Sequence, residues 1–246
     1  MCHKSCINFG QKNLSVDEIK EKRVIDIGSY NVNGSLKKTV KALYPAEYIG
    51  VDIEEGPDVD IVCDAENLAK KFGKESFDVV ISTEMLEHVR DWKKVISNIK
   101  KICKSEGIIL LTTRSYGFDY HAYPYDYWRY EVKDMENIFS DCEILTINDD
   151  DEKNGVLVKV KKPENFIEKD LSNYELYSIV ANKRVKDIKN QDFNTIYYRC
   201  LIYNYLVSKK LTNLKIFLQN KFPFLYSVAR SLYRKQKSCQ ENLNAE

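Results

Sequence analysis

Residues 23–35 read RVIDIGSYNVNGS, a short apolar run that ends in a glycine and opens into a polar loop. Such a run is typical of a strand that is buried on both faces of a parallel sheet. Gly28 can take backbone angles that a side chain forbids, and it lets the main chain approach a bound ligand. The next strand-like run, at 48–52, ends in Asp52, 24 positions after Gly28. An acidic side chain there can accept hydrogen bonds from both ribose hydroxyls of a nucleotide-derived cofactor.

Strands and helices alternate from this point to about residue 160. Further strands are expected at 59–63, 77–82, 107–113, 142–147 and 155–160. Helices are expected after a capping box at 15–18, over 36–43, and over 91–103, where apolar residues recur at helical spacing. This alternation predicts an α/β fold with a mostly parallel sheet that is covered on both faces and binds its ligand beyond the carboxyl ends of the strands.

The composition is that of an ordinary folded protein of one large domain, or of one domain with an appendage. Among the 246 residues, 38 Lys and Arg balance 37 Asp and Glu, which argues against a surface committed to nucleic acid or anionic lipid. No apolar run reaches the roughly 20 residues of a membrane helix, and the start lacks the apolar core of a secretory signal. The seven scattered cysteines are an odd number, so they do not indicate a disulfide framework. The sequence therefore predicts a cytoplasmic protein.

Charge is unevenly distributed along the chain. Residues 182–246 carry 13 Lys and Arg against 4 Asp and Glu, a net charge of +9, which leaves −8 for residues 1–181. The strand and helix alternation also ends near Pro163. We therefore expect two parts: a catalytic domain over 1–162 and a basic, tyrosine-rich helical extension over 163–246.

The extension is expected to form helices over 170–188, over 194–220 and from about 225 to 237. Its central helix has little polar face, which predicts that something covers it. Three interpretations stay open: a lid packed on the first domain, a homodimer interface, or a basic surface that rests peripherally on anionic membrane. Packing or dimerisation is favoured, because exposed apolar patches commonly mark partner surfaces.

Five stretches match, in order, the motifs of a known family. They are VIDIGSYNVNGS at 24–35, YIGVDIEEG at 48–56, DIVCDAENL at 60–68, FDVVISTEMLEHV at 77–89 and WKKVISNIKKICKSEGIILLTT at 92–113. Their succession resembles the class I S-adenosylmethionine-dependent methyltransferases, and is most similar to the methyltransferase-11-like group with Leu-Glu-His-Val after the fourth strand. The resemblance covers about 24–162. It implies a Rossmann-like, seven-stranded, mostly parallel sheet that ends in an antiparallel hairpin.

The resemblance also implies S-adenosyl-L-methionine as cofactor and S-adenosyl-L-homocysteine as product. Carried over residue by residue, Gly28 lies under the methionine moiety, Asp52 takes the ribose hydroxyls, and Asp64 contacts the adenine. The expected cofactor-binding residues are Asp26, Gly28, Ser29, Tyr30, Asn33, Asp52, Ile53, Asp64, Ala65, Thr83 and Glu84. The glycine loop departs from the family where Ser29 and Tyr30 replace a frequent second glycine, which bears on cofactor affinity. Because Gly-x-Gly-x-x-Gly is absent, a nicotinamide-dependent oxidoreductase is disfavoured.

Methyl transfer needs an acceptor aligned with the sulfonium and a base for the acceptor's proton. His88 follows the fourth strand and His121 follows the fifth, so these two, with Asp126, are the expected catalytic residues. For His88 a packing or capping role is an equal alternative. Glu84, Glu87 and His88 also resemble the metal-binding Glu-x-x-Glu-His of small-RNA 3′-terminal methyltransferases, where a hard divalent ion binds. We expect no metal, because the same string is common in metal-free relatives.

Residues 114–130 read RSYGFDYHAYPYDYWRY, and eight of the fifteen residues from 116 to 130 are aromatic. An aromatic wall with interleaved polar groups suits a sugar ring or a flat aromatic acceptor. The expected substrate-binding residues are Tyr123, Tyr125, Trp128 and Arg129. The alternative is that Tyr127 and Trp128 simply anchor the segment to the core. We expect both roles, with Trp128 and Tyr130 packed and with four residues facing the pocket: His121, Tyr123, Tyr125 and Asp126. The YPYDYWRY string resembles that of methyltransferases found with surface-glycan biosynthesis.

The sequence therefore predicts a methyltransferase acting on a small or medium-sized acceptor, and we favour O-methylation of a sugar or glycan intermediate. Two alternatives remain. One is a metal-assisted RNA methyltransferase, which the net charge of −8 over 1–181 disfavours because it repels a polyanion. The other is a catalytically idle, cofactor-binding scaffold whose extension recruits a partner.

Overall fold

The computed structural model describes residues 3–150 and 152–221. The chain divides into two compact units, Met1–Thr195 and Ile196–Glu246. The boundary expected after Lys162 thus falls inside the first unit. The physical reason is a hairpin beyond residue 163 that pairs with residues 128–129, at the end of the aromatic segment (residues 116–130) of the first unit.

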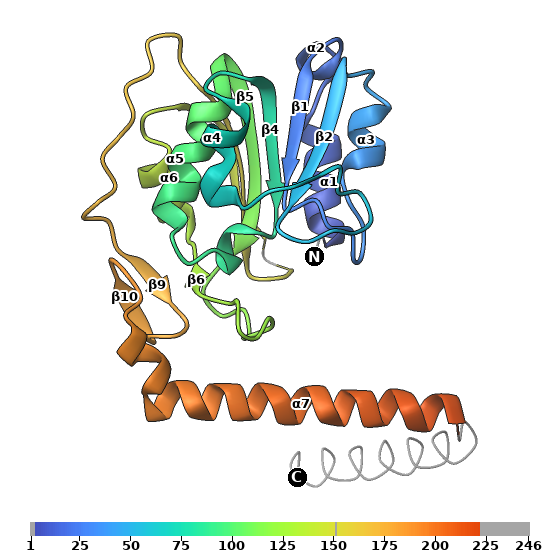
Figure 1. Cartoon of the computed structure of the whole chain (residues 1–246), viewed down its shortest axis with the longest axis vertical. Coiled ribbons are helices and arrows are strands. Elements are labelled where there is room, and N and C mark those ends of the chain that lie inside the picture. Colours follow the sequence, from blue (N-terminus) through green and yellow to red (C-terminus); the bar gives the residue numbers. More distant parts are fainter. Residues whose placement is uncertain (1–2, 151, 222–246) are drawn as a thin grey trace, which may run out of the picture. The chain divides into compact units, whose positions relative to one another are not determined.

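Seven strands of the first unit form one sheet in the order β3-β2-β1-β4-β5-β8-β7 (Figure 1). Their bounds are β1 Arg23–Ile27, β2 Glu47–Asp52, β3 Ile61–Val62, β4 Phe77–Thr83, β5 Cys103–Arg114, β7 Glu143–Asp150 and β8 Gly155–Lys161. Neighbours from β3 to β5 pair in parallel, and β8 runs antiparallel to both β5 and β7. Strand order reverses between β1 and β4, where open α/β sheets bind ligands. The predicted fold class is confirmed.

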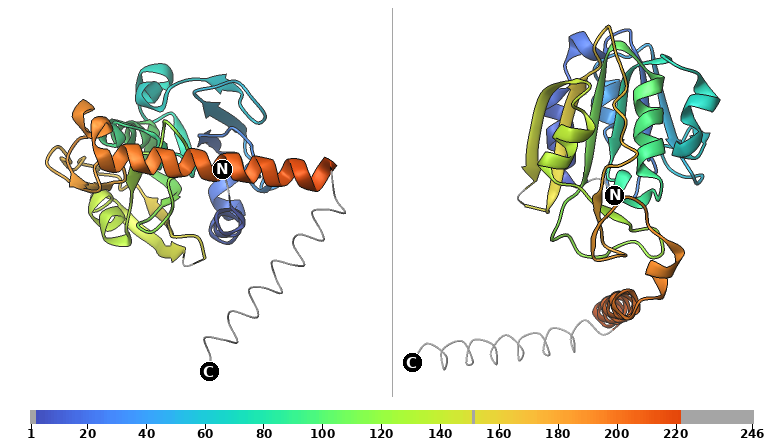
Figure 2. Two further views of the ribbon diagram at one scale, coloured as in Figure 1. Left: turned by 90° about the horizontal axis from the view of Figure 1, so that it is seen from below. Right: turned by 90° about the vertical axis from the view of Figure 1, so that its left-hand side faces the viewer.

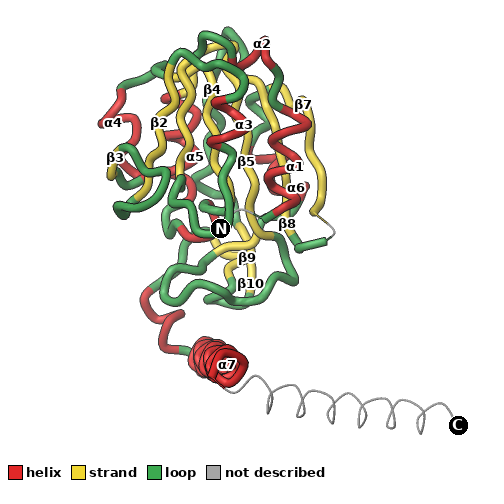
Figure 3. The backbone as a smooth tube through the Cα atoms, turned by 90° about the vertical axis from the view of Figure 1, so that its right-hand side faces the viewer, coloured by secondary structure: helices red, strands yellow, loops and turns green. Residues whose placement is uncertain are grey.

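Helices cover both faces of this sheet. On one face lie α1 (Lys4–Asn13), α2 (Val16–Ile19) and α3 (Lys37–Lys41); on the other lie α4 (Leu68–Phe72), α5 (Trp92–Ile102) and α6 (Val132–Ile138) (Figures 1 and 3). Alternate residues of each strand point to opposite faces, so Val79 and Ile81 of β4 pack against Phe9 of α1 and Leu36 in one core. The capping box before α2 is present as predicted. Helices α1, α4 and α6 were not predicted.

A second, three-stranded sheet has the order β10-β9-β6. Strand β6 (Trp128–Arg129) pairs antiparallel with β9 (Leu176–Ser178), which pairs antiparallel with β10 (Lys183–Val185). The helix predicted over 170–188 is therefore wrong. Tyr177 and Ser178 pair with Arg129 and Trp128, about 50 residues earlier in the chain, and such long-range pairing overrides local helical spacing.

The second unit contains α7 (Ile196–Lys221), which confirms the helix expected over 194–220 (Figure 2). Many of its apolar side chains are exposed, including Tyr203, Leu211 and Phe217. None of the helices in the described part of the chain has both the length and the apolar composition that crossing a membrane requires. The helix expected to reach about 237 lies outside the described residues. The homodimer, the peripheral membrane contact and the cytoplasmic location stay predictions.

Candidate active site

A cleft of about 720 Å³ lies where β1, β2 and β4 end, at the reversal of strand order. Of the expected cofactor-binding residues, it is lined by Gly28, Tyr30, Asp52, Ile53, Asp64, Ala65 and Glu84. His88 and Tyr125 line it too, so the cleft joins the cofactor residues to the expected acceptor side. Sequence reasoning missed its apolar members, among them Ile27, Val32, Met85 and Val89. They lie within the motifs at 24–35 and 77–89, but their apolar side chains carry no chemical signal of a binding role.

Gly28 is required by its surroundings. Its φ of +78° lies in the left-handed region, and a Cβ built there would lie 2.7 Å from Cβ of Met85. The residue after β1 therefore approaches the loop after β4 more closely than any side chain allows. This close approach shapes the floor of the cleft.

Backbone amides orient the two carboxylates at the rim of the cleft. Asp52 Oδ2 accepts a hydrogen bond from the amide of Tyr30 at 3.1 Å. Asp64 Oδ1 accepts one from the amide of Glu66 at 2.8 Å, which begins a 3₁₀ turn at Ala65–Asn67. Each carboxylate keeps further acceptor capacity for a ligand, because an ionised carboxylate has about four lone-pair sites.

Four expected cofactor residues do not line the cleft: Asp26, Ser29, Asn33 and Thr83. The side chain of Asp26 points away from Ile27 because side chains alternate along β1. Its Oδ2 accepts a hydrogen bond from the Tyr48 hydroxyl at 2.7 Å, and burial raises the pKa of Asp26 to about 7. Asp26 therefore belongs to the interior of the sheet.

Glu84 begins the loop after β4 with a strained backbone, at a φ of 56°. Its carboxylate contacts the guanidinium of Arg114 and accepts hydrogen bonds from Thr112 Oγ1 at 3.1 Å and from Cys6 Sγ at 3.4 Å. Burial and the neighbouring charge of Glu87 raise the pKa of Glu84. The sequence gives no signal for Arg114, which reaches Glu84 only because β4 and β5 are neighbours.

Four titratable side chains gather beside the cleft, and we call Glu87, His88, His121 and Asp126 the histidine cluster. The imidazole rings of His88 and His121 have centroids 4.8 Å apart. Glu87 is fully buried; its Oε2 accepts from Thr113 Oγ1 at 2.8 Å, and its Oε1 lies 3.7 Å from His88 Nε2. The structure thus brings all three expected catalytic residues together and adds Glu87 to them.

Hydrogen bonds settle the tautomer of each neutral imidazole. His88 Nδ1 lies 2.6 Å from the carbonyl oxygen of Tyr125, which only accepts, so Nδ1 carries the proton. His121 Nδ1 lies 2.9 Å from Asp126 Oδ2, so it too donates. Both rings are left with a lone pair on Nε2, the form that can act as a base or a ligand.

Burial and neighbouring groups shift the pKa values of the histidine cluster. Burial lowers the pKa of His88 despite the nearby carboxylates. Burial alone would raise the pKa of Glu87, but its electrostatic interactions with His88, His121 and Arg114 outweigh burial and hold that pKa below its usual range. Burial would likewise raise the pKa of Asp126, but hydrogen bonds from His121 and Arg129 hold it well below its usual range.

The aromatic segment is anchored at its carboxyl end. Trp128 and Arg129 are almost fully buried, and Trp128 Nε1 donates to the carbonyl oxygen of Arg90 at 3.1 Å. Arg129 donates to both oxygens of Asp126, at 2.6 and 3.0 Å. These two expected substrate residues therefore hold the segment in place and do not line the cleft. Tyr123 and Tyr125 are exposed, and only Tyr125 lines the cleft.

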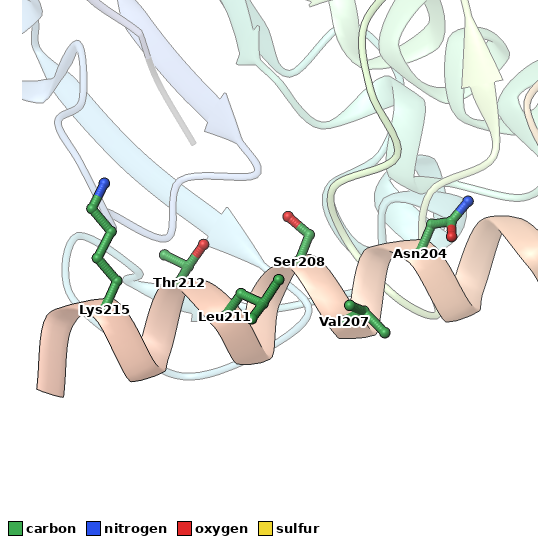
Figure 4. Close-up of a pocket in the computed structure, with 6 residues that line it drawn as sticks. All are labelled: Asn204, Val207, Ser208, Leu211, Thr212 and Lys215. Carbon is green, nitrogen blue, oxygen red and sulfur yellow. The ribbon is translucent and has the colours of Figure 1, made fainter. Parts of the chain in front are cut away.

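A second hollow, of about 320 Å³, lies on α7 alone (Figure 4). Its lining residues recur every three to four positions along one side of the helix: Asn204, Val207, Ser208, Leu211, Thr212 and Lys215. Lys215 is its only titratable group. We therefore place the candidate active site at the first cleft.

A family model described as a methyltransferase domain matches residues 6–143, more than half of the chain. The chain belongs to this methyltransferase family. It carries a class I S-adenosylmethionine-dependent methyltransferase domain, as the motifs indicated, and the expected enzyme class and cofactor are confirmed with it.

The methyltransferase is also similar to curated proteins. A ubiquinone biosynthesis O-methyltransferase of Rhizobium etli is 31% identical over 124 residues, which cover 45% of this chain and 48% of that protein. The chain spans about half the length of the curated relatives it matches. The similarity to these relatives is therefore a similarity of the methyltransferase domain and does not extend over their full length.

Solved structures show the same fold. The YcgJ protein of Bacillus subtilis is 15% identical, with a TM-score of 0.51, and the match covers 66% of this methyltransferase and all of that chain. The [4+2]-cyclase SpnF is 13% identical with the same TM-score, over 65% of this methyltransferase and 81% of that chain. At these identities the likeness concerns architecture, and function has to be argued from the site.

Proposed function

We propose that this methyltransferase transfers the methyl group of S-adenosyl-L-methionine to a hydroxyl oxygen of a small or medium-sized, ring-shaped acceptor. The observation that carries the proposal is the histidine cluster beside the cleft, with two oriented imidazoles. Methylation of a hydroxyl oxygen requires removal of its proton, and such a cluster supplies that chemistry. The favoured acceptor is a sugar or glycan intermediate, because exposed tyrosines offer flat faces to a ring.

A phenolic or catechol ring is the second candidate acceptor. It is favoured by the similarity to ubiquinone biosynthesis O-methyltransferases, which share about half their length with this chain. The cleft suits such a ring as well, since Tyr125 and Met85 line it beside His88. Both candidates use the same oxygen chemistry.

In the proposed complex, Gly28 lies under the methionine moiety, Asp52 accepts from the ribose hydroxyls, and Asp64 with Ala65 contacts the adenine. The sulfonium then faces the end of the cleft lined by Glu84 and His88. An acceptor hydroxyl loses its proton at the histidine cluster, its oxygen attacks the methyl carbon, and the carbon–sulfur bond breaks with its electron pair going to sulfur. The product is neutral S-adenosyl-L-homocysteine.

Asp52→Ala should weaken the binding of S-adenosyl-L-homocysteine by about 1–3 kcal/mol, the scale of a lost hydrogen bond to a charged group. Calorimetric titration measures the change. The matched control is Glu47→Ala, an acidic residue at the other end of the same strand, which should leave the affinity unchanged. Equal affinities for wild type and Asp52→Ala would remove Asp52 from the cofactor site.

Acceptor class is tested by incubating the protein with S-adenosyl-L-methionine labelled in the methyl group and a panel of acceptors. The panel contains nucleotide sugars, glycan oligosaccharides, catechols and a short single-stranded RNA. We expect label in a sugar hydroxyl, and label in a catechol would select the second candidate. Label in RNA alone would contradict the proposal, and cofactor binding without transfer to any acceptor would favour a scaffold.

A further inference from the structure

We propose that Glu87, His88 and His121 bind a divalent transition-metal ion, Zn²⁺ or Mn²⁺, at the acceptor side of the cleft. One ligand atom from each residue lies within 4.8 Å of the others. The residues come from the turn after β4 and from the aromatic segment, so the fold brings them together over more than thirty positions of sequence. The ion site itself is independent of the proposed function; its use in catalysis rests on that function.

The ligand set is one carboxylate oxygen and two imidazole nitrogens. Ligand atoms at about 2.0–2.2 Å from an ion lie roughly 3–3.5 Å apart when adjacent. The ligand atoms now lie up to 4.8 Å apart, so the longest of these distances has to shorten by about 1–2 Å when an ion binds. His121 is partly exposed, and a shift of its side chain that keeps the contact of Nδ1 with Asp126 would supply this movement.

An independent observation is the orphaned oxygen of Glu87. This side chain is fully buried, and among the described residues its Oε1 accepts no hydrogen bond. Leaving a buried polar atom without a partner costs about 1–3 kcal/mol, and more for a charged group. Oε1 lies on the side of His88 Nε2, so a cation held between them would give it the partner it lacks.

Each histidine has the kind of hydrogen-bond acceptor at Nδ1 that metal-binding histidines have at their second ring nitrogen. Metal-binding histidines donate their second ring N–H to a carboxylate or a backbone carbonyl, which fixes ring orientation and tautomer. His88 has the carbonyl of Tyr125 in this place, and His121 has the carboxylate of Asp126. Arg129 in turn holds Asp126. In this tautomer Nε2 of each ring carries the lone pair that can bind an ion.

The donor set selects the class of ion and excludes Glu84. Imidazole nitrogens suit Zn²⁺ and other first-row transition ions, whereas Mg²⁺ and Ca²⁺ prefer oxygen. The carboxylate of Glu84 is engaged by Arg114 and Thr112 and lies outside the group. The ligands therefore differ from the Glu84, Glu87 and His88 set that the sequence offered, because His121 takes the place of Glu84.

A bound ion would explain how the acceptor is activated. Coordination of the acceptor hydroxyl lowers its pKa, so the O–H proton leaves to water and the oxygen stays on the ion as an alkoxide or phenolate. Its lone pair then forms the bond to the methyl carbon as the carbon–sulfur bond breaks. In this account the histidines hold the ion, and the proton is lost from an ion-bound oxygen.

The test uses the full chain, stripped of metal by a chelator and dialysed, and titrated calorimetrically with ZnCl₂, MnCl₂ and MgCl₂ in separate experiments. We expect one Zn²⁺ or Mn²⁺ per chain and no comparable binding of Mg²⁺. His121→Ala and Glu87→Gln should each weaken binding by at least about 10-fold, the lower end of what even a neighbour of a ligand contributes. Visible absorption of the Co²⁺-loaded protein should change in the same variants.

Two controls keep the ligands identifiable. Glu84→Gln and His3→Ala should retain wild-type metal affinity, because neither residue belongs to the group. Glu87→Gln alters a buried site. If this variant fails to fold, the titration of His121→Ala decides whether the proposed ligands bind the ion. Binding that is lost in Glu84→Gln and kept in His121→Ala would overturn the proposal, as would no binding of either ion.

The same experiment separates this inference from the proposed function. Undiminished methyl transfer in chelator by a protein that binds neither ion overturns the metal site and leaves O-methylation standing. Metal binding that depends on His121, in a protein that transfers no methyl group to any acceptor of the panel, supports the site and overturns the proposed function.

Discussion

His121→Ala should lower the turnover number by about 10²–10⁴-fold, the range by which a positioned acid or base accelerates a reaction. The imidazole lies against the buried Asp126, and its centroid is 4.8 Å from that of His88. Its loss therefore removes either the base or the ion ligand that activates the acceptor. Affinity for S-adenosyl-L-homocysteine should be unchanged, since His121 does not line the cofactor cleft. Steady-state kinetics with the best acceptor and calorimetry provide the two readouts.

His3→Ala is the matched control. His3 and His121 each pack an imidazole edge-to-face with Phe118, at centroid distances of 6.4 and 5.0 Å, so both variants lose a contact to that ring. Only His121 belongs to the histidine cluster. Equal turnover in the two variants would move the catalytic role elsewhere. Loss of cofactor affinity together with turnover would give His121 a structural role.

Arg129→Ala should destabilise the first unit by about 3–5 kcal/mol, because it removes the guanidinium partner of the buried carboxylate of Asp126. Asp126 and Arg129 are both essentially inaccessible to solvent and share two hydrogen bonds. Arg129 also donates to the carbonyl oxygens of Phe118 and Asp119, so the aromatic segment loses its anchor as well. Urea unfolding followed by circular dichroism measures the loss.

Arg23→Ala is the comparison for this variant. Arg23 pairs with Glu47 at 2.7 Å, but both side chains are about 44–45% exposed. An exposed pair contributes about 0–1 kcal/mol, since water already solvates the separated charges. If Arg129→Ala cost no more than Arg23→Ala, the ion pair would not be what holds the aromatic segment.

Local pattern predicted those parts of the fold in which local interactions decide the structure. A window of about ten residues was enough to predict several elements: the apolar runs of β1, β2 and β4, the capping box before α2 and the amphipathic α5. The hairpin of β9 and β10 does not, because its strands exist through pairing with β6. The same pairing placed residues 163–195 with the first unit, where the change in charge had suggested a boundary.

The candidate site also has residues that the local sequence predicts and residues whose position depends on the tertiary fold. Gly28, Asp52 and Asp64 follow strands in a recognisable order, so their convergence at one cleft could be anticipated. Whether a side chain faces the cleft depends on strand alternation, which turned Asp26 toward Tyr48. The approach of His121 to Glu87 depends on how the aromatic segment folds back over the turn after β4.

The central claim is that the cleft at the ends of β1, β2 and β4 binds the methyl donor. Calorimetric titration of the full chain with S-adenosyl-L-homocysteine, and separately with NAD, tests it most directly. The account predicts one molecule of S-adenosyl-L-homocysteine per chain and no binding of NAD. A folded chain that binds no S-adenosyl-L-homocysteine would contradict it.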